Sequence, residues 1–265
     1  MSSSEPRGAV LITGASSGLG LEFAKLFAAA GHPLALSARR EDKLQELAAQ
    51  LRAAHGIAVT VLPLDLAQPG AAPKLAQAVA DAGLQIEILV NNAGFGAFGE
   101  FVKTELRDTT EMLQLNVTAL AELTRLFLPQ MLARGRGRIL NVGSVAGFVP
   151  GPYMSAYYAS KAFVGSFSQA LGEELRGTGV TVSCLCPGPT ATEFGQRGSM
   201  KPMKAPRSWR MGALEVAQAG FDGLMQGRSL IIPGFSNNLI VCAVKFLPRG
   251  FIARQVGKHQ RNFLS

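Results

Sequence analysis

Tyr157 and Lys161 are the residues of this sequence whose types and spacing best suit proton transfer. They stand near the start of a segment that runs to about Leu175 and repeats apolar residues at helical spacing. Residues four apart share one face of a helix, so the phenol and the ammonium should lie one turn apart. A neighbouring cation favours the phenolate and lowers the pKa of a tyrosine, which predicts a general acid or base near neutral pH. Tyr158 has no lysine four residues further on and is interpreted as a packing residue. Such pairs also occur by chance, so the hypothesis depends on the elements that position this one.

Length and composition set the class of protein. The chain has 265 residues, of which 48% are hydrophobic and 17% charged, so it is globular and long enough for one large α/β domain or two small ones. No apolar run is long enough for a membrane span, and the N-terminus carries no signal pattern, so a cytoplasmic protein is expected. The three cysteines include Cys184 and Cys186, interpreted as buried apolar residues of a strand, and no metal site is expected.

The net charge of +8 is compatible with nucleic acid, an anionic membrane surface or phosphorylated ligands. The basic residues are spread along the chain without a nucleic-acid-binding module. A phosphate-bearing cofactor is therefore favoured, and no nucleic acid partner is expected.

Short apolar runs alternate with helical patterns along most of the chain. The runs predict strands at residues 9–12, 34–38, 57–64, 86–90, 138–142, 180–186 and 230–232. Helices are predicted between them, including a long one over residues 105–134 that is bent near Pro129. This order predicts a doubly wound, Rossmann-like parallel sheet of about seven strands with helices on both faces, forming a single domain over residues 1–265.

Two segments fall outside this alternation. Residues 187–212 are rich in Gly, Pro, Lys and Arg and predict a loop that closes over a ligand. Its basic residues Lys201, Lys204, Arg207 and Arg210 are interpreted as solvent-exposed, with contact to an acyl carrier or coenzyme A as the alternative. Residues 235–265 form a C-terminal extension that mixes apolar and basic residues. One or two helices packing on the body or on another subunit are favoured over an amphipathic membrane-surface segment.

The segment between the first strand and the first helix contains Gly14, Ser16, Ser17, Gly18, Leu19 and Gly20. Small residues allow a pyrophosphate to approach the backbone, and the helix N-terminus attracts its negative charge. A phosphate-binding loop is therefore favoured over a mere tight connection.

The second strand is followed by Arg39 and Arg40, where a dinucleotide-binding fold selects its cofactor. An acidic residue there would accept the ribose hydroxyls of NAD, whereas an arginine binds the 2′-phosphate of NADP. We expect NADP(H), with Arg39 as the stronger candidate and Arg40, Ser16 and Ser17 as helpers.

Further motifs follow in a fixed order. Asp65 and Leu66 follow the third strand, Asn91-Asn92-Ala93-Gly94 follows the fourth, and Asn116 lies in the long helical region. Ser144 stands thirteen residues before Tyr157, and Pro187-Gly188 is followed by Thr192. From residue 8 to residue 233 the sequence resembles the short-chain dehydrogenase/reductase (SDR) family.

The resemblance implies a role for each matching residue. Tyr157 would protonate a carbonyl oxygen during reduction and Ser144 would donate a hydrogen bond to the same oxygen. Lys161 would lower the Tyr157 pKa and hold the nicotinamide ribose, and Asn116 would connect Lys161 to solvent through a water molecule. The resemblance also implies that the other matching residues bind NADP(H), namely the glycine loop, Asp65, Leu66, Asn92, Ala93, Gly94, Pro187, Gly188 and Thr192. By the same resemblance the protein is expected to form a homodimer or homotetramer.

The substrate is expected to be a small apolar ketone, aldehyde or secondary alcohol. Aromatic and apolar residues gather in the loops expected at the carboxyl ends of the strands, namely Phe95, Phe98, Phe148, Val149, Tyr153, Met154, Phe194 and Trp209. Three alternatives stay open: a ketoacyl-thioester reductase, a non-catalytic cofactor sensor or scaffold, and a peripheral membrane reductase. The C-terminal extension departs from the short glycine-rich ending of fatty-acid ketoacyl reductases, which disfavours the first.

Overall fold

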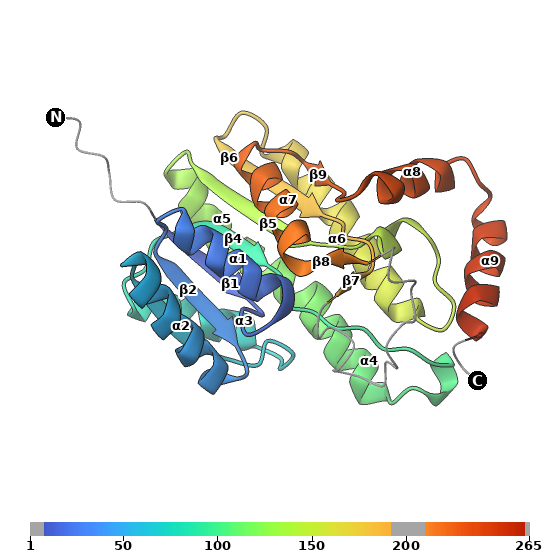
Figure 1. Ribbon diagram of the computed structural model, residues 1–265, viewed down its shortest axis with the longest axis horizontal. Coiled ribbons are helices and arrows are strands. Elements are labelled where there is room, and N and C mark those ends of the chain that lie inside the picture. The colour runs from blue at the N-terminus through green and yellow to red at the C-terminus, as the bar shows by residue number, and fades with distance from the viewer. Residues whose placement is uncertain (1–7, 192–209, 263–265) are drawn as a thin grey trace.

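The computed structural model describes residues 8–191 and 210–262. Its centre is a sheet of seven parallel strands in the order β3-β2-β1-β4-β5-β6-β9, which confirms the predicted sheet (Figure 1). The strands are β1 (Ala9–Thr13), β2 (Leu34–Ala38), β3 (Val59–Pro63), β4 (Ile86–Asn91), β5 (Gly137–Val142), β6 (Val180–Leu185) and β9 (Leu230–Ile231). A separate pair, β7 (Thr190–Ala191) and β8 (Met211–Gly212), joins the two ends of the segment that the structure leaves undescribed.

Helices cover both faces of the sheet, because successive side chains of a buried parallel strand point to opposite faces. Leu11 of β1 packs in one core with Leu75 and Phe127, whereas its neighbour Ile12 packs in the other with Phe23. The helices that supply these cores are α1 (Gly18–Ala29), α2 (Glu41–His55), α3 (Ala71–Asp81), α5 (Leu120–Ala133), α6 (Ser155–Glu174) and α7 (Ala213–Met225).

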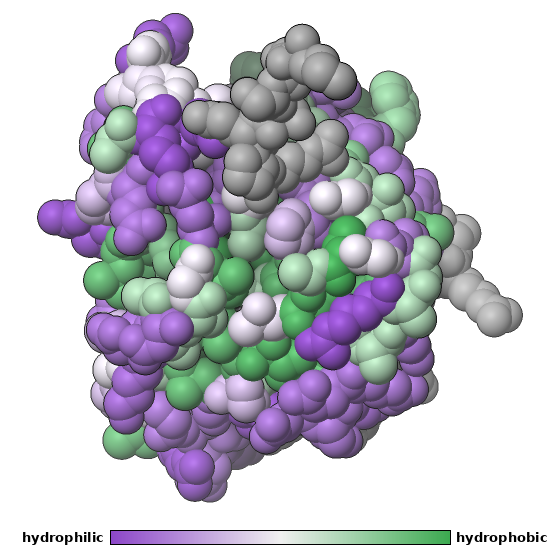
Figure 2. Space-filling view, turned by 90° about the vertical axis from the view of Figure 1, so that its left-hand side faces the viewer, coloured by the Kyte–Doolittle hydropathy of each residue, from purple (hydrophilic) through white to green (hydrophobic). Residues whose placement is uncertain are grey.

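Apolar residues also reach the surface near the edge of the sheet. The edge strand β3 is only half-buried over residues 60–62. Figure 2 views the side of the molecule on which α2 and β2 lie in Figure 1, and it shows hydrophobic residues gathered between hydrophilic margins. Surface apolarity is therefore not confined to the C-terminal extension.

The long helical region differs from the prediction. It consists of α4 (Leu106–Leu113), a π-helical turn over Gln114–Ala119 and α5, and Pro129 lies inside α5 without ending it. The irregularity is therefore at Asn116, not near Pro129. The carboxamide of Asn116 accepts a hydrogen bond from the Phe95 N–H at 3.1 Å and donates one to the Phe95 carbonyl at 2.9 Å. The wide turn thus carries a side chain that ties the helix to the loop after β4.

The chain order of the strands reverses between β1 and β4, and in such sheets ligands bind outside the carboxyl ends of the strands at that point. Asn92, just after β4, connects the loops that follow β1 and β4 at this position. Its side-chain nitrogen lies 2.9 Å from the Thr13 carbonyl and 3.3 Å from the Gly14 carbonyl. The Thr13 hydroxyl in turn accepts from the Asn92 N–H at 3.0 Å. These contacts hold the two loops together at the crevice.

The C-terminal extension forms two helices, α8 (Phe235–Val244) and α9 (Arg249–Arg261), at the right of Figure 1. Gln260 of α9 donates a hydrogen bond to the Tyr158 hydroxyl at 2.9 Å. This contact agrees with the packing role expected of Tyr158. The expectation that the helices pack on the body holds for one side of α9, whereas α8 buries only Asn237 and Val241.

Candidate active site

Ser144, Tyr157 and Lys161 lie together at the carboxyl end of the sheet. Tyr157 and Lys161 are one turn apart on α6, and the Lys161 Nζ lies 5.9 Å from the centre of the Tyr157 ring. Ser144 follows β5 and caps a short 3₁₀ helix, η3 (Val145–Phe148), by accepting a hydrogen bond from the Ala146 N–H at 3.1 Å. Its hydroxyl also hydrogen-bonds the Tyr157 side chain. The end of β5 and the start of α6 thus place a hydroxyl and a phenol side by side.

Asn116 and Lys161 approach the same small residue, Gly94. A Cβ added to Gly94 would lie 2.9 Å from the Asn116 Oδ1 and 3.6 Å from the Lys161 Nζ. Both side chains are buried, and the Lys161 ammonium donates a hydrogen bond to the Val142 carbonyl at 2.8 Å. The structure therefore brings all four predicted catalytic residues into one neighbourhood.

Ser160 was missed by the sequence reasoning. Its hydroxyl donates to the Tyr157 carbonyl at 2.6 Å and accepts from the Asn116 side chain at 3.1 Å. Ser160 is fully buried and connects the π-helical turn to the first turn of α6. The one available signal was its position three residues after Tyr157, where a helical serine can bond back to a carbonyl.

The electrostatics differ from the prediction in one respect. Burial raises the pKa of Tyr157 to about 12, and the hydrogen bond with Ser144 acts in the opposite direction. Burial also lowers the pKa of Lys161 to about 8. The predicted lowering of the Tyr157 pKa by Lys161 does not appear in this arrangement, because burial is the largest cause of the shift and the ammonium is bonded to the Val142 carbonyl. The phenol keeps its proton at neutral pH and can donate it.

The loop between β1 and α1 has the shape of a phosphate cradle. Gly14 has a φ of +67°, and a Cβ there would lie 2.9 Å from the Asn92 side-chain nitrogen. A Cβ on Gly20 would lie 2.2 Å from the Gly14 carbonyl oxygen. The backbone therefore folds closely on itself while α1 begins at Gly18. This close, side-chain-free turn at a helix N-terminus fits the pyrophosphate of a dinucleotide.

The two arginines after β2 are placed differently. Arg39 is exposed, whereas Arg40 is half-buried and donates hydrogen bonds to the Ser16 hydroxyl at 3.2 and 3.4 Å. Arg40 thus lies directly against the glycine loop. The sequence pattern instead favoured Arg39 as the residue that binds the 2′-phosphate.

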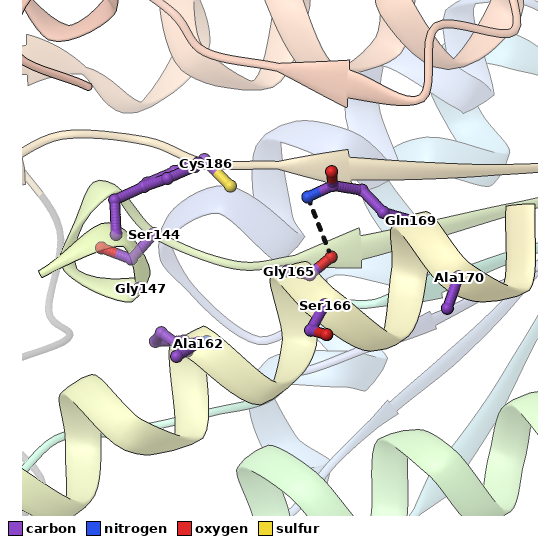
Figure 3. A pocket seen from close by; sticks show the side chains of 10 residues that line it. Ser144, Gly147, Ala162, Gly165, Ser166, Gln169, Ala170 and Cys186 are labelled. Atoms are coloured by element: carbon purple, nitrogen blue, oxygen red, sulfur yellow. Dashed lines mark hydrogen bonds between the residues drawn. The ribbon is translucent and has the colours of Figure 1, made fainter. Parts of the chain in front are cut away.

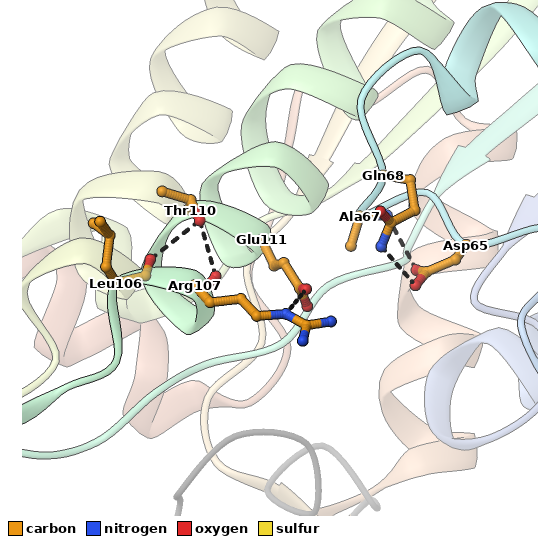
Figure 4. Close-up of polar contacts among 7 residues, drawn as sticks. All are labelled: Asp65, Ala67, Gln68, Leu106, Arg107, Thr110 and Glu111. Atoms are coloured by element: carbon orange, nitrogen blue, oxygen red, sulfur yellow. Dashed lines mark hydrogen bonds and ion pairs between the residues drawn. The ribbon is translucent and has the colours of Figure 1, made fainter.

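Asp65 is held just after β3 by its own turn (Figure 4). One carboxylate oxygen accepts from the Ala67 N–H at 3.2 Å and the other from the Gln68 side chain at 3.4 Å. Leu66 is buried in the core, so only its backbone can face a ligand.

The segment after β6 contacts the catalytic serine. The Pro187 carbonyl accepts a hydrogen bond from the Val145 N–H at 3.0 Å and a longer one from the Ser144 hydroxyl at 3.4 Å. A Cβ on Gly188 would lie 2.5 Å from the side chain of Asn237, at the start of α8. Several predicted residues lie outside the described residues, namely Thr192, Phe194, Lys201, Lys204, Arg207 and Trp209.

A pocket of about 470 Å³ opens beside Ser144 and runs along α6 (Figure 3). Its lining includes Ser144, Lys161 and Cys186 at one end and Gly165, Ser166, Gln169 and Ala170 along the helix. Of the aromatic residues predicted to face the substrate, Phe148 lines it, whereas Phe95 is a core residue. Among the described residues, the lining thus includes the catalytic candidates Ser144 and Lys161 but not Tyr157.

A sequence model of the short chain dehydrogenase family matches residues 8–201. The chain belongs to the short-chain dehydrogenase family. A very-long-chain 3-oxoacyl-CoA reductase of Phaeosphaeria nodorum is 39% identical over 190 residues, which make up 70% of this chain and 56% of that reductase. Sulfoacetaldehyde reductase 2 of Chromohalobacter salexigens is 40% identical over 187 residues, 70% of this chain and 73% of that protein. This short-chain dehydrogenase therefore spans little more than half the length of the fungal relative.

Solved structures agree with the fold over nearly the whole chain. A short-chain dehydrogenase from Sphingobium yanoikuyae in complex with NADPH has a TM-score of 0.82 and 36% identity, covering 90% of this chain and 92% of that one. A short-chain dehydrogenase/reductase from Burkholderia phymatum in complex with NAD has a TM-score of 0.79 and 31% identity, covering 91% and 93%. The two neighbours were solved with different nicotinamide cofactors.

Proposed function

We propose that this short-chain dehydrogenase is an NADP(H)-dependent oxidoreductase that interconverts a carbonyl and an alcohol on an apolar substrate. The observation that carries the proposal is the hydrogen bond between Ser144 and Tyr157 at the carboxyl end of the sheet. Lys161 and Asn116 converge on the same point at Gly94. Catalytic groups that act as a unit must meet in this way.

Each residue has a definite task in carbonyl reduction. NADPH, when bound, supplies the hydride that adds to the carbonyl carbon. Negative charge then grows on the carbonyl oxygen, and the Ser144 hydroxyl stabilises it with a hydrogen bond. Tyr157 delivers its phenolic proton to that oxygen, for which its raised pKa keeps it protonated. Lys161, held by the Val142 carbonyl, lies where a cation can assist reprotonation of Tyr157.

The preference for NADP(H) rests on charge. Arg40 lies against Ser16 of the glycine loop, and Arg39 stands beside it at the end of β2. An arginine at this position can form a fork onto a 2′-phosphate. The Sphingobium neighbour bound to NADPH supports this choice, and the Burkholderia neighbour bound to NAD makes it a point to test.

The substrate class is a hydrophobic ketone, aldehyde or secondary alcohol. A ketoacyl thioester is the second candidate, because the fungal relative is named a very-long-chain 3-oxoacyl-CoA reductase. We also propose a homodimer or homotetramer, as the family resemblance implies.

The test replaces Tyr157 by Phe, with Tyr158→Phe as the matched control on the same helix turn. NADPH binding is followed by nicotinamide fluorescence, and NADPH oxidation is followed with apolar ketones and a 3-oxoacyl-CoA. Tyr157→Phe should lower turnover by about 10²- to 10⁴-fold, because it removes the proton donor, and should leave NADPH binding unchanged. Tyr158→Phe should keep most turnover. NADPH binding without turnover of any carbonyl by the unaltered protein would favour a cofactor sensor.

A further inference from the structure

The two C-terminal helices expose large apolar side chains to an unusual degree. Phe235 is 85% exposed and Phe246 is 83% exposed, and Leu239 of α8 and Phe251 of α9 are also exposed. A soluble helix normally turns such residues towards a core. The α8–α9 surface, defined here as the exposed side chains of residues 235–262, therefore has an apolar face that residues 8–191 and 210–234 leave uncovered.

The same segment is strongly basic. Residues 235–265 contain Lys245, Arg249, Arg254, Lys258 and Arg261 and no aspartate or glutamate. All five cations are exposed. More than half of the net charge of +8 is thus concentrated in the last 31 residues.

The α8–α9 surface is anchored to the segment that precedes α6, the helix that carries Tyr157. The Arg261 side chain donates to the Tyr153 hydroxyl at 3.0 Å, and the Tyr153 carbonyl accepts from the Gly99 N–H at 2.9 Å. Just beyond Gly99, Phe101 and Val102 of the 3₁₀ helix η1 (Phe101–Lys103) are 65% and 88% exposed. Exposed apolar residues thus also occur in the loop after β4, which Tyr153 links to α9.

Charge decides which occupant fits this surface. A second copy docking the same surface symmetrically would bring five cations against five. An anionic bilayer offers hydrocarbon for the phenylalanines and phosphate for the lysines and arginines at once. None of the described helices is long and apolar enough to cross a bilayer. We propose that the α8–α9 surface binds peripherally to an anionic lipid bilayer.

The experiment is sedimentation of the full chain with vesicles. Phosphatidylcholine vesicles are compared with vesicles that also contain phosphatidylglycerol, at low and at high salt. Two variants alter the surface: Phe235→Ser with Phe246→Ser, and Arg249→Gln with Arg254→Gln. Two matched controls alter other exposed sites: Leu214→Ser on α7, which is 56% exposed, and Lys43→Gln with Lys74→Gln on α2 and α3.

The unaltered protein should bind the anionic vesicles and lose most binding at high salt. The charge variant should lose about fivefold in affinity per cation, which corresponds to ~1 kcal/mol each near an anionic surface. The apolar variant should lose at least about tenfold, because each phenylalanine leaves hydrocarbon. Both controls should bind as the unaltered protein does.

Three results would overturn the proposal. The unaltered protein could stay in solution at low salt, or the tail variants could bind vesicles as well as the controls do. Alternatively, the apolar variant could abolish self-association of a protein that ignores vesicles, which would assign the surface to a second copy. The readout is binding without turnover, so its outcome is independent of the Tyr157→Phe test, and circular dichroism confirms that each variant is folded.

Discussion

The guanidinium of Arg40 donates hydrogen bonds to the Ser16 hydroxyl, with its Nη2 at 3.2 Å and its Nε at 3.4 Å. The contact joins the end of β2 to the loop between β1 and α1. It holds a positive charge at the end of β2, where the proposed preference for NADP(H) requires one.

Replacement of Arg40 by Leu should therefore weaken NADPH binding more than NADH binding. A hydrogen bond to a charged group contributes about 1.5–3 kcal/mol, so NADPH affinity should fall by roughly 10- to 100-fold. Arg39→Leu is the matched control and should have the smaller effect, because Arg39 is exposed. Fluorescence titration with both cofactors measures the ratio. A larger effect of Arg39→Leu would restore the order that the sequence suggested.

Replacement of Gly20 by Ala tests whether the glycine loop packs as closely as the structure shows. A Cβ there would lie 2.2 Å from the Gly14 carbonyl oxygen, which is backbone and cannot move aside cheaply. Gly20→Ala should lower the free energy of unfolding by about 1–3 kcal/mol and abolish tight NADPH binding.

Gly165 of α6 is the control, since a Cβ there meets nothing within 4 Å. Gly165→Ala should stabilise the protein by about 0.5–1 kcal/mol through helix propensity. Urea unfolding measures both variants. Equal stabilities for the two would contradict the geometry of the loop.

Much of the fold could be predicted because apolar runs and turn residues mark its elements. The bounds of β2 (Leu34–Ala38) match the predicted range. The π-helical turn at Asn116 could not be predicted, because one extra residue in a turn barely alters helical periodicity and neither glycine nor proline marks it. Pro129 drew the prediction to the wrong place.

The catalytic motifs were visible in the sequence, but their surroundings were not. Burial raises the Tyr157 pKa, and no residue pattern reports how deeply a phenol lies. Similarly, Asn141 accepts from Asn91 at 2.9 Å and donates to Ser168 at 2.9 Å inside the sheet and α6. Such a polar chain joins residues from three segments, so only the folded chain reveals it.

Ser160 should act as a positioning residue for Tyr157. Ser160→Ala removes the part-buried bond to the Tyr157 carbonyl and the buried bond to the Asn116 carboxamide. We expect a loss of about 1–3 kcal/mol in stability. We also expect a roughly tenfold lower kcat with an unchanged KM, because the phenol is less firmly aimed.

Ser166→Ala, on an exposed position of the same helix, is the control and should change neither quantity. Ser160→Thr, which keeps the hydroxyl, should recover part of kcat. A loss of stability without any change in kcat would show that Ser160 has only a structural role.

Because Lys161 is buried, we expect the stability of the protein to depend on pH in an unusual way. Burial lowers its pKa to about 8 in the folded chain from 10.5, so the folded state holds fewer protons than the unfolded state between these pH values. Stability should therefore rise as pH increases from about 8 towards 10, by on the order of 3 kcal/mol at most. Above about pH 10 the titration of Tyr157 has the opposite effect on stability. Its pKa is raised to about 12, so the unfolded state loses the phenolic proton first and stability falls.

Lys161→Met isolates the lysine contribution. The variant removes the buried ammonium and its bond to the Val142 carbonyl, so it should be more stable than the unaltered protein at pH 7 and nearly independent of pH between 8 and 10. Urea unfolding at pH 7, 8, 9 and 10 measures both chains. Arg52→Met, at a partly exposed arginine on α2, controls for loss of charge and should keep the rise. If the unaltered protein shows no rise, Lys161 stays fully protonated across this range and its ammonium is better solvated than its burial implies.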